Sequence, residues 1–179
     1  MKKIRAKARD AAFQFRMGAG FPGDVNRTHP ATIEPVMPNA TTPPTAYGQA
    51  VLIASDGITV RPYTVGDITT MPWGVTVRPF PFQQASGSNF GAAAFGAATP
   101  GVTIMDVLRS GYIMATVPAG QTVVKGGTVY MWTAASSGAH VQGGFEATNP
   151  GGSGIALGSF VTFNGAADSS GNVELCFNI

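Results

Sequence analysis

The sequence predicts an all-β domain, a jelly-roll-like sandwich or small β-barrel, that follows a long extended N-terminal arm. The first observation is composition: 24 glycines and 13 prolines among 179 residues disfavour helices. The second is a series of short apolar runs separated by turn signals, which is typical of antiparallel strands. The third is the uneven distribution of basic residues, which separates the start of the chain from the rest.

The C-terminal segment "NVELCFNI" is the clearest strand in the sequence. Its apolar residues alternate strictly with polar ones, which predicts a half-buried strand. The apolar face holds Val173, Leu175, Phe177 and Ile179, and the other face holds Asn172, Glu174, Cys176 and Asn178. We expect this strand to pair with "SFVTFN" (159–164) across a turn at 168–171.

Further short strands, seven to nine in all, are expected along residues 47–179. The runs "ITVRPY" and "VTVRPF" resemble each other and both end at proline, which places each at a sheet edge or at a strand end. A strand–turn–strand unit is expected over 119–135 around Gly126 and Gly127, and a flexible loop over 148–158. The other expected strands lie at 50–54 and 111–118.

Residues 1–46 are expected to form a basic, proline-rich arm, and residues 47–179 the β-domain. The first 30 residues hold seven basic and two acidic side chains, a net charge of +5. The remaining residues hold four basic and seven acidic side chains, a net charge of −3. Residues 1–15 have weak helical amphipathicity and are expected to order only on a partner. Six prolines in residues 17–46 predict an extended connector.

The sequence shows no catalytic, cofactor or metal site. The glycines of "GAGFPG" have dinucleotide-fingerprint spacing, but no strand precedes them and Pro22 prevents the required helix. His29 and His140 lack further ligands at metal-binding spacing. Cys176 has no neighbouring base, so a passive thiol is expected. The nine carboxylates are scattered singly, although folding can bring distant ones together. We expect neither an enzyme nor a cofactor.

The chain also shows no membrane span or secretory signal, because glycine, proline and polar residues interrupt every apolar stretch. Trp73 and Trp132, with Phe80, Phe82 and Tyr130, suggest either a core or subunit interface or a platform for sugars or bases. Burial is the expected role, since aromatic side chains bury large areas. The negative charge of the β-domain also disfavours nucleic-acid stacking.

We expect partner contacts at two places. The first is the arm, where basic residues would dock electrostatically, with Phe13 and Phe15 as apolar anchors. The second is the low-complexity loop 86–101, "SGSNFGAAAFGAATPG", with Phe90 and Phe95, because long loops without secondary structure are commonly functional. The basic docking residues are Lys2, Lys3, Arg5, Lys7, Arg9 and Arg16.

Three segments carry a resemblance to a known family: "GVTVRPFPFQQ", the stretch from "DVLRSGYIMATVPAGQ" to "HVQGGFEA", and "FNGAADSSGNVELCFNI". They resemble the structural cement (decoration) proteins of tailed bacteriophage capsids over residues 47–179. The resemblance implies a non-enzymatic virion protein on the outer surface of the capsid. It also implies a barrel or jelly-roll body, dimers or trimers, and the major capsid protein as partner.

Three other functions stay open on sequence alone. A tail, fibre or adhesin component would also be glycine-rich and all-β. A virion protein whose basic arm binds nucleic acid would show strongly salt-dependent binding, although an arm on the outer surface would not meet packaged DNA. A small β-barrel hydrolase would need a polar pocket that the sequence does not show.

Overall fold

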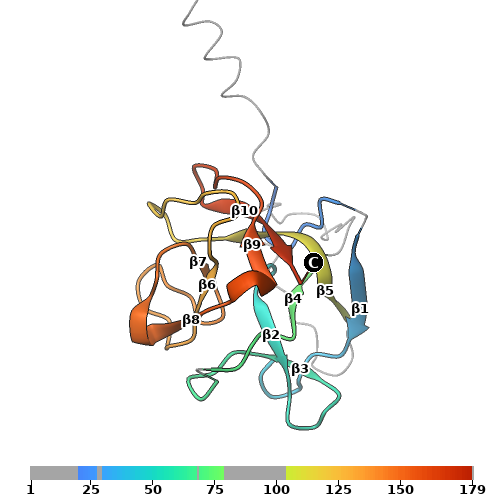
Figure 1. The fold of residues 1–179 in the computed structure, drawn as a ribbon. Helices are drawn as coiled ribbons and strands as arrows, with labels where there is room; N and C mark the ends of the chain where they lie inside the picture. Colours follow the sequence, from blue (N-terminus) through green and yellow to red (C-terminus); the bar gives the residue numbers. More distant parts are fainter. Residues whose placement is uncertain (1–19, 28–29, 68, 79–103, 179) are drawn as a thin grey trace, which may run out of the picture.

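The computed structural model describes residues 20–27, 30–67, 69–78 and 104–178. These residues form two antiparallel sheets, so the all-β prediction is confirmed (Figure 1). The described residues contain ten strands, and the nine of them that lie in residues 47–179 are within the expected seven to nine. The larger sheet contains β1 (Thr32–Val36), β2 (Ala50–Ile53), β3 (Val60–Pro62), β4 (Gly74–Thr76), β5 (Met105–Thr116), β9 (Val161–Phe163) and β10 (Asn172–Phe177). The smaller sheet contains β6 (Tyr130–Trp132), β7 (Phe145–Glu146) and β8 (Gly154–Ala156).

The 12-residue strand β5 organises the larger sheet. The strand order is β3-β2-β4-β5-β10-β9, and β1 also pairs with β5. β1 lies along residues 105–110 and β10 along residues 111–116. β5 therefore connects the two halves of the sheet, and segments distant in sequence meet along it.

The segment that follows β1 closes one half of this sheet into a barrel-like ring. Pro38 forms a parallel bridge to Val60 of β3. The Val60 N–H donates to the Met37 carbonyl at 2.9 Å, and the Asn39 N–H donates to the Val60 carbonyl at 2.8 Å. Pairing thus runs from β1 through β5, β4, β2 and β3 back to the segment after β1.

Two apolar cores stabilise this arrangement. The small one lies within the ring and is formed by Val51, Val60, Met105 and Val107. The large one lies between the larger sheet and the three-stranded sheet, seen in orange at the left of Figure 1, and includes Leu108, Met131, Phe145, Phe163 and Phe177. Burial of fully enclosed apolar side chains contributes about 1.5–3 kcal/mol each, so the large core dominates the stability of the domain.

The C-terminal strand confirms its predicted alternation. Val173, Leu175 and Phe177 are fully buried, whereas Glu174 and Cys176 on the opposite face are partly exposed. β10 pairs with β9 as expected. The proline-terminated run at 58–63 forms β3, the last strand in the order of the larger sheet, which ends at Pro62 as expected, whereas β4 is an interior strand that ends at Thr76.

Three local expectations differ from the structure. Residues 17–46 were expected to be a connector, but their described part contains β1, because an extended segment of exposed residues can still pair through its backbone. Residues 121–125 form no strand before the Gly126 turn, where the Gly126 N–H donates to the Phe163 carbonyl at 2.7 Å. Residues 148–158 are not a loop without secondary structure, since they contain the 3₁₀-helix η1 (Gly151–Ser153) and the strand β8, and the 3₁₀-helix η2 (Gly158–Phe160) begins at their end.

Candidate functional site

The contact residues predicted from the sequence lie outside the described part of the chain. They are Lys2, Lys3, Arg5, Lys7, Arg9, Phe13, Phe15, Arg16, Phe90 and Phe95. The structure does describe the points where their two segments join the domain. These are Gly20, after the first segment, and Arg78 and Ile104, on either side of the second.

These three joining points lie close together on the larger sheet. The Arg78 N–H donates to the Gly23 carbonyl at 2.8 Å, and the Gly23 N–H donates to the Met114 carbonyl of β5 at 2.8 Å. The adjacent Val77 N–H donates to the Asp106 carbonyl at 2.9 Å. The basic arm and the 79–103 segment therefore leave the domain side by side. We call this place the common root, defined by Gly23, Arg78 and Asp106.

The backbone at the common root requires glycine at position 23. Gly23 has φ +88°, a left-handed conformation that other residues rarely adopt. A Cβ there would lie 2.7 Å from the Tyr47 Cβ and 2.9 Å from the Arg78 backbone nitrogen. The close approach of three chain segments thus depends on the missing side chain.

An arginine–aromatic cluster covers the common root. The Arg78 guanidinium lies 5.0 Å from the centre of the Phe21 ring and 5.4 Å from that of Tyr47, which is within cation–π range. It also forms an ion pair with Asp24 at 3.7 Å. Burial raises the pKa of the Tyr47 hydroxyl, an effect that Arg78 partly opposes. Phe21 is 54% exposed, so the cluster presents an aromatic side chain to solvent.

A second cluster fixes the following residues on β10. Arg27 Nη2 donates to Glu174 Oε2 at 2.9 Å, and its guanidinium lies 4.3 Å from the centre of the Tyr112 ring. The Asn164 amide also donates to Glu174. The hydrogen bond with Glu174 raises the pKa of Arg27. These contacts hold the segment after the common root against β5 and β10.

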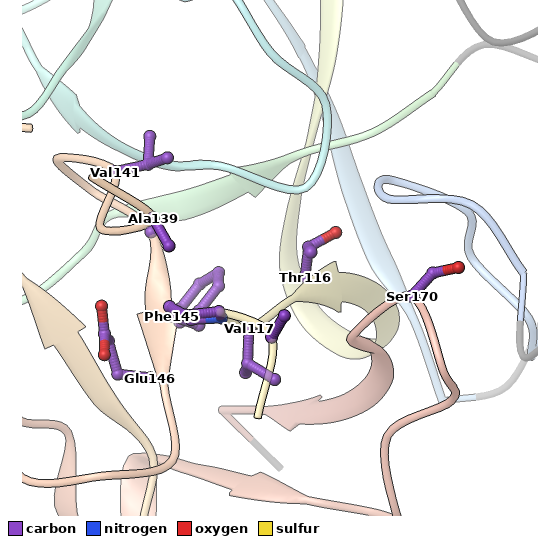
Figure 2. Close-up of a pocket in the computed structure, with 10 residues that line it drawn as sticks. Thr116, Val117, Ala139, Val141, Phe145, Glu146 and Ser170 are labelled. Carbon is purple, nitrogen blue, oxygen red and sulfur yellow. The ribbon is translucent and has the colours of Figure 1, made fainter. Parts of the chain in front are cut away.

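A cavity of about 240 Å³ lies beside the end of β5, with Phe145 and Val117 between Glu146 and Ser170 (Figure 2). Glu146 is only 2% exposed. Its carboxylate accepts from the Gln121 amide and lies 2.7 Å from His140 Nδ1. These contacts satisfy the buried carboxylate, as burial of a polar group requires.

His140 thus has a carboxylate partner that the sequence analysis did not identify. Its ring also stacks on Trp132, with centroids 4.3 Å apart. His140 and Glu146 are six positions apart in the sequence, and the fold brings their side chains together. Among the residues that the structure describes, no group of three or more His, Cys, Asp and Glu side chains is arranged to hold a metal ion. His29 lies outside the described residues.

The described tryptophans have structural partners. Trp73 packs on the small core, and the Arg109 guanidinium lies 3.9 Å from the centre of its ring. Arg109 also pairs with Glu34 of β1 at 3.5 Å, so this stack joins β1 to the sheet. Phe80 and Phe82 lie outside the described residues.

Within the described part of the chain, no helix is long and apolar enough to span a membrane. The described surface carries arginine–aromatic clusters and exposed apolar side chains on an all-β domain. Contiguous exposed apolar surface is typical of proteins that bind other macromolecules.

The chain belongs to the XM1 gp53 minor capsid protein family, whose model matches residues 11–176. It is therefore a phage capsid-associated structural protein and not an enzyme, and its location is the virion. A chain of the solved structure "The capsid of Myoviridae Phage XM1" has the same fold, with a TM-score of 0.67 and 14% sequence identity. That match covers 92% of this chain and 93% of the capsid chain. No curated protein matches the sequence significantly.

Proposed function

We propose that this protein is a cement, or decoration, protein that binds the outer surface of the assembled capsid and bridges neighbouring capsomers. Its main partner is the major capsid protein, and copies of the chain associate as dimers or trimers. The observation that carries this proposal is the common root, where the Arg78 N–H donates to the Gly23 carbonyl at 2.8 Å. The two segments with predicted contact residues leave the domain there, so both can reach one target surface.

The charge distribution supports an acidic target for the arm. Residues 1–19 hold six basic residues and one acidic residue. Positive charge accelerates docking onto an acidic surface, whereas apolar residues slow dissociation. Phe13 and Phe15, and Phe90 and Phe95 in the second segment, are the proposed apolar anchors.

Binding to the assembled shell alone would stabilise it by mass action. At a free concentration one hundred times Kd, each occupied site contributes about 2.7 kcal/mol. A shell offers many equivalent sites, so modest affinity at each site is enough to oppose the pressure of packaged DNA.

Co-sedimentation with capsid shells that lack this protein tests the proposal. The arm deletion should end before Gly20, because residues from Gly20 on pack on the domain through the Gly23 backbone hydrogen bonds, and a deletion to residue 46 would also remove β1 from the sheet. Full-length protein, the 1–19 deletion, and a form with the six basic residues replaced by glutamine are compared at several salt concentrations. We expect saturable binding that weakens in both variants, and binding by the full-length protein that decreases as salt screens the charges.

A Phe90→Ser/Phe95→Ser variant tests the second segment in the same assay, with light scattering of the free protein to measure its oligomeric state. Absence of shell binding by the full-length protein would refute the cement function. If the full-length protein instead retained DNA in a salt-sensitive manner, the nucleic-acid-binding alternative would replace it.

A further inference from the structure

The outward face of β1 carries apolar side chains that no described residue covers. Ile33 is 42% exposed, Met37 is 40% exposed, and Ile104, just before β5, is 68% exposed. Val36 pairs with Met105 in the antiparallel β1–β5 register. The next residue after Val36, Met37, is therefore opposite Ile104, the residue before Met105. Clustered exposed apolar residues mark interaction sites more often than scattered ones do.

A carboxylate lies within this apolar surface. Asp106 is directly opposite Pro35 in the register and lies on the same face of β5 as Ile104, because side chains alternate. It is half-buried, and among the described residues no side chain bonds to its carboxylate. We call the surface formed by Ile33, Met37, Ile104 and Asp106 the β1 strip.

The backbone of β1 argues against an added strand as its partner. The Asp106 carbonyl accepts from the N–H of Val77, the residue directly after β4, so the backbone of Asp106 faces the β4 side of β5. Pro35, opposite Asp106, therefore directs its backbone away from β5. Proline has no N–H at this outer edge and so interrupts strand pairing. A partner of the β1 strip must contact its side chains.

The charges of the chain indicate the chemistry of that partner. The described residues hold five basic and eight acidic side chains, a net of −3, whereas residues 1–19 carry +5. Each of the four described arginines forms an ion pair with an acidic residue. The arm thus holds most of the basic residues that remain to pair with Asp106.

The arm also starts beside the β1 strip. Gly23 bonds to Arg78, and the adjacent Val77 bonds to Asp106. Arg16 is four residues before Gly20, a reach of up to about 14 Å. The strip is about 14 Å long from Ile33 to Met37, at about 3.4 Å per residue. Residues 13–16 can therefore reach the strip of their own chain.

We propose that in the free protein the arm, residues 1–16, docks on the β1 strip of its own chain. Phe13 and Phe15 cover the exposed apolar side chains, and a basic residue of the arm pairs with Asp106. This inference concerns the protein without capsid and extends beyond the proposed cement function. A shell that binds the arm would then compete with the β1 strip for it.

Trypsin cleavage after Arg16 in the full-length protein tests this docking, without capsid shells. A docked arm is cut slowly, at a rate set by the fraction of molecules with the arm released. Met37→Ser and Ile104→Ser should each accelerate cleavage by a factor of about 5–30, the usual consequence of losing one apolar contact. Val124→Ser is the matched control, because Val124 is 65% exposed and is not part of the strip.

The role of charge is tested with Asp106→Asn, which should also accelerate cleavage. Added salt should accelerate cleavage of the wild type but have much less effect on the cleavage rate of this variant. Docking within one chain predicts a cleavage rate that does not change on dilution of the protein. Equal rates in wild type and the two serine variants, each confirmed as folded by its melting temperature, would overturn the proposal. Protection that is lost on dilution would also overturn it, since a second copy would then hold the arm.

Discussion

Replacement of Gly23 by alanine is the most direct test of the common root. Two unfavourable contributions combine at this position. The left-handed conformation, φ +88°, costs a residue with a Cβ about 1–2 kcal/mol. The added Cβ would also lie 2.7 Å from the Tyr47 Cβ and 2.9 Å from the Arg78 backbone nitrogen, and overpacking of this kind costs about 1–3 kcal/mol. Together they predict a loss of about 2–5 kcal/mol in the free energy of unfolding.

Gly126→Ala separates the two contributions. Gly126 has φ +74°, but no atom lies within 4 Å of a Cβ placed there. This control should therefore lose only the conformational part, about 1–2 kcal/mol. The difference between the two variants measures how closely the chain segments approach each other at the common root.

Urea unfolding of both variants provides the measurement. With a denaturant dependence of about 1–3 kcal/mol per molar urea, a 2 kcal/mol difference separates their midpoints by about 0.7–2 M. Equal midpoints would refute the reasoning, because Tyr47 and Arg78 would then not pack closely on Gly23. The two predicted contact segments would no longer be fixed side by side.

Four further variants test one ion pair, one buried carboxylate and the large core. Arg61 holds the pKa of Asp67 well below its usual range, so this pair stabilises the protein above about pH 4 and the effect disappears as the pH falls further. Asp67→Asn should cost about 1.5–3 kcal/mol at pH 7 and less at pH 2.5, where part of the contribution remains because the folded-state pKa of Asp67 lies lower still; urea unfolding measures both. Glu146→Ala leaves buried donors without an acceptor at about 1–3 kcal/mol each, whereas Glu146→Gln should melt closer to the wild type because it retains one acceptor. Leu175→Ala should cost about 2–5 kcal/mol in the same unfolding assay, and a smaller loss would mean that the large core is not closely packed there.

Strands that alternate in burial were predictable from sequence, and others were not. The last strand, β10, was identified because Val173, Leu175 and Phe177 alternate with polar residues. In β1 polarity does not follow burial, since the apolar Ile33 and Pro35 are exposed whereas the charged Glu34 is partly buried, and the backbone pairing with β5 is what makes it a strand. β8 has only three residues and begins with glycine, so neither its strand conformation nor its pairing with β6 could be predicted from the sequence.

The candidate site was predictable in its residue types but not in its geometry. The basic arm was evident from its charge, and the 86–101 loop from its glycines and alanines. Their meeting at the common root depends on a hydrogen bond between residues 55 positions apart in the sequence, Gly23 and Arg78. The contact between His140 and Glu146 is similar, because the side chains meet only after the small sheet has formed.

The common root has a consequence for how the proposed binding would work. Two segments that leave a rigid domain at one place are confined to the same small volume, so attachment of one raises the effective concentration of the other near the shell. Deletion of the arm should then remove the contacts of the arm and also weaken binding of the second segment to the shell. If the two segments moved independently at this place, the effective concentration would be lower. Close packing of Gly23 against Tyr47 and Arg78 would therefore matter for a cement protein, although none of these residues has to touch the capsid.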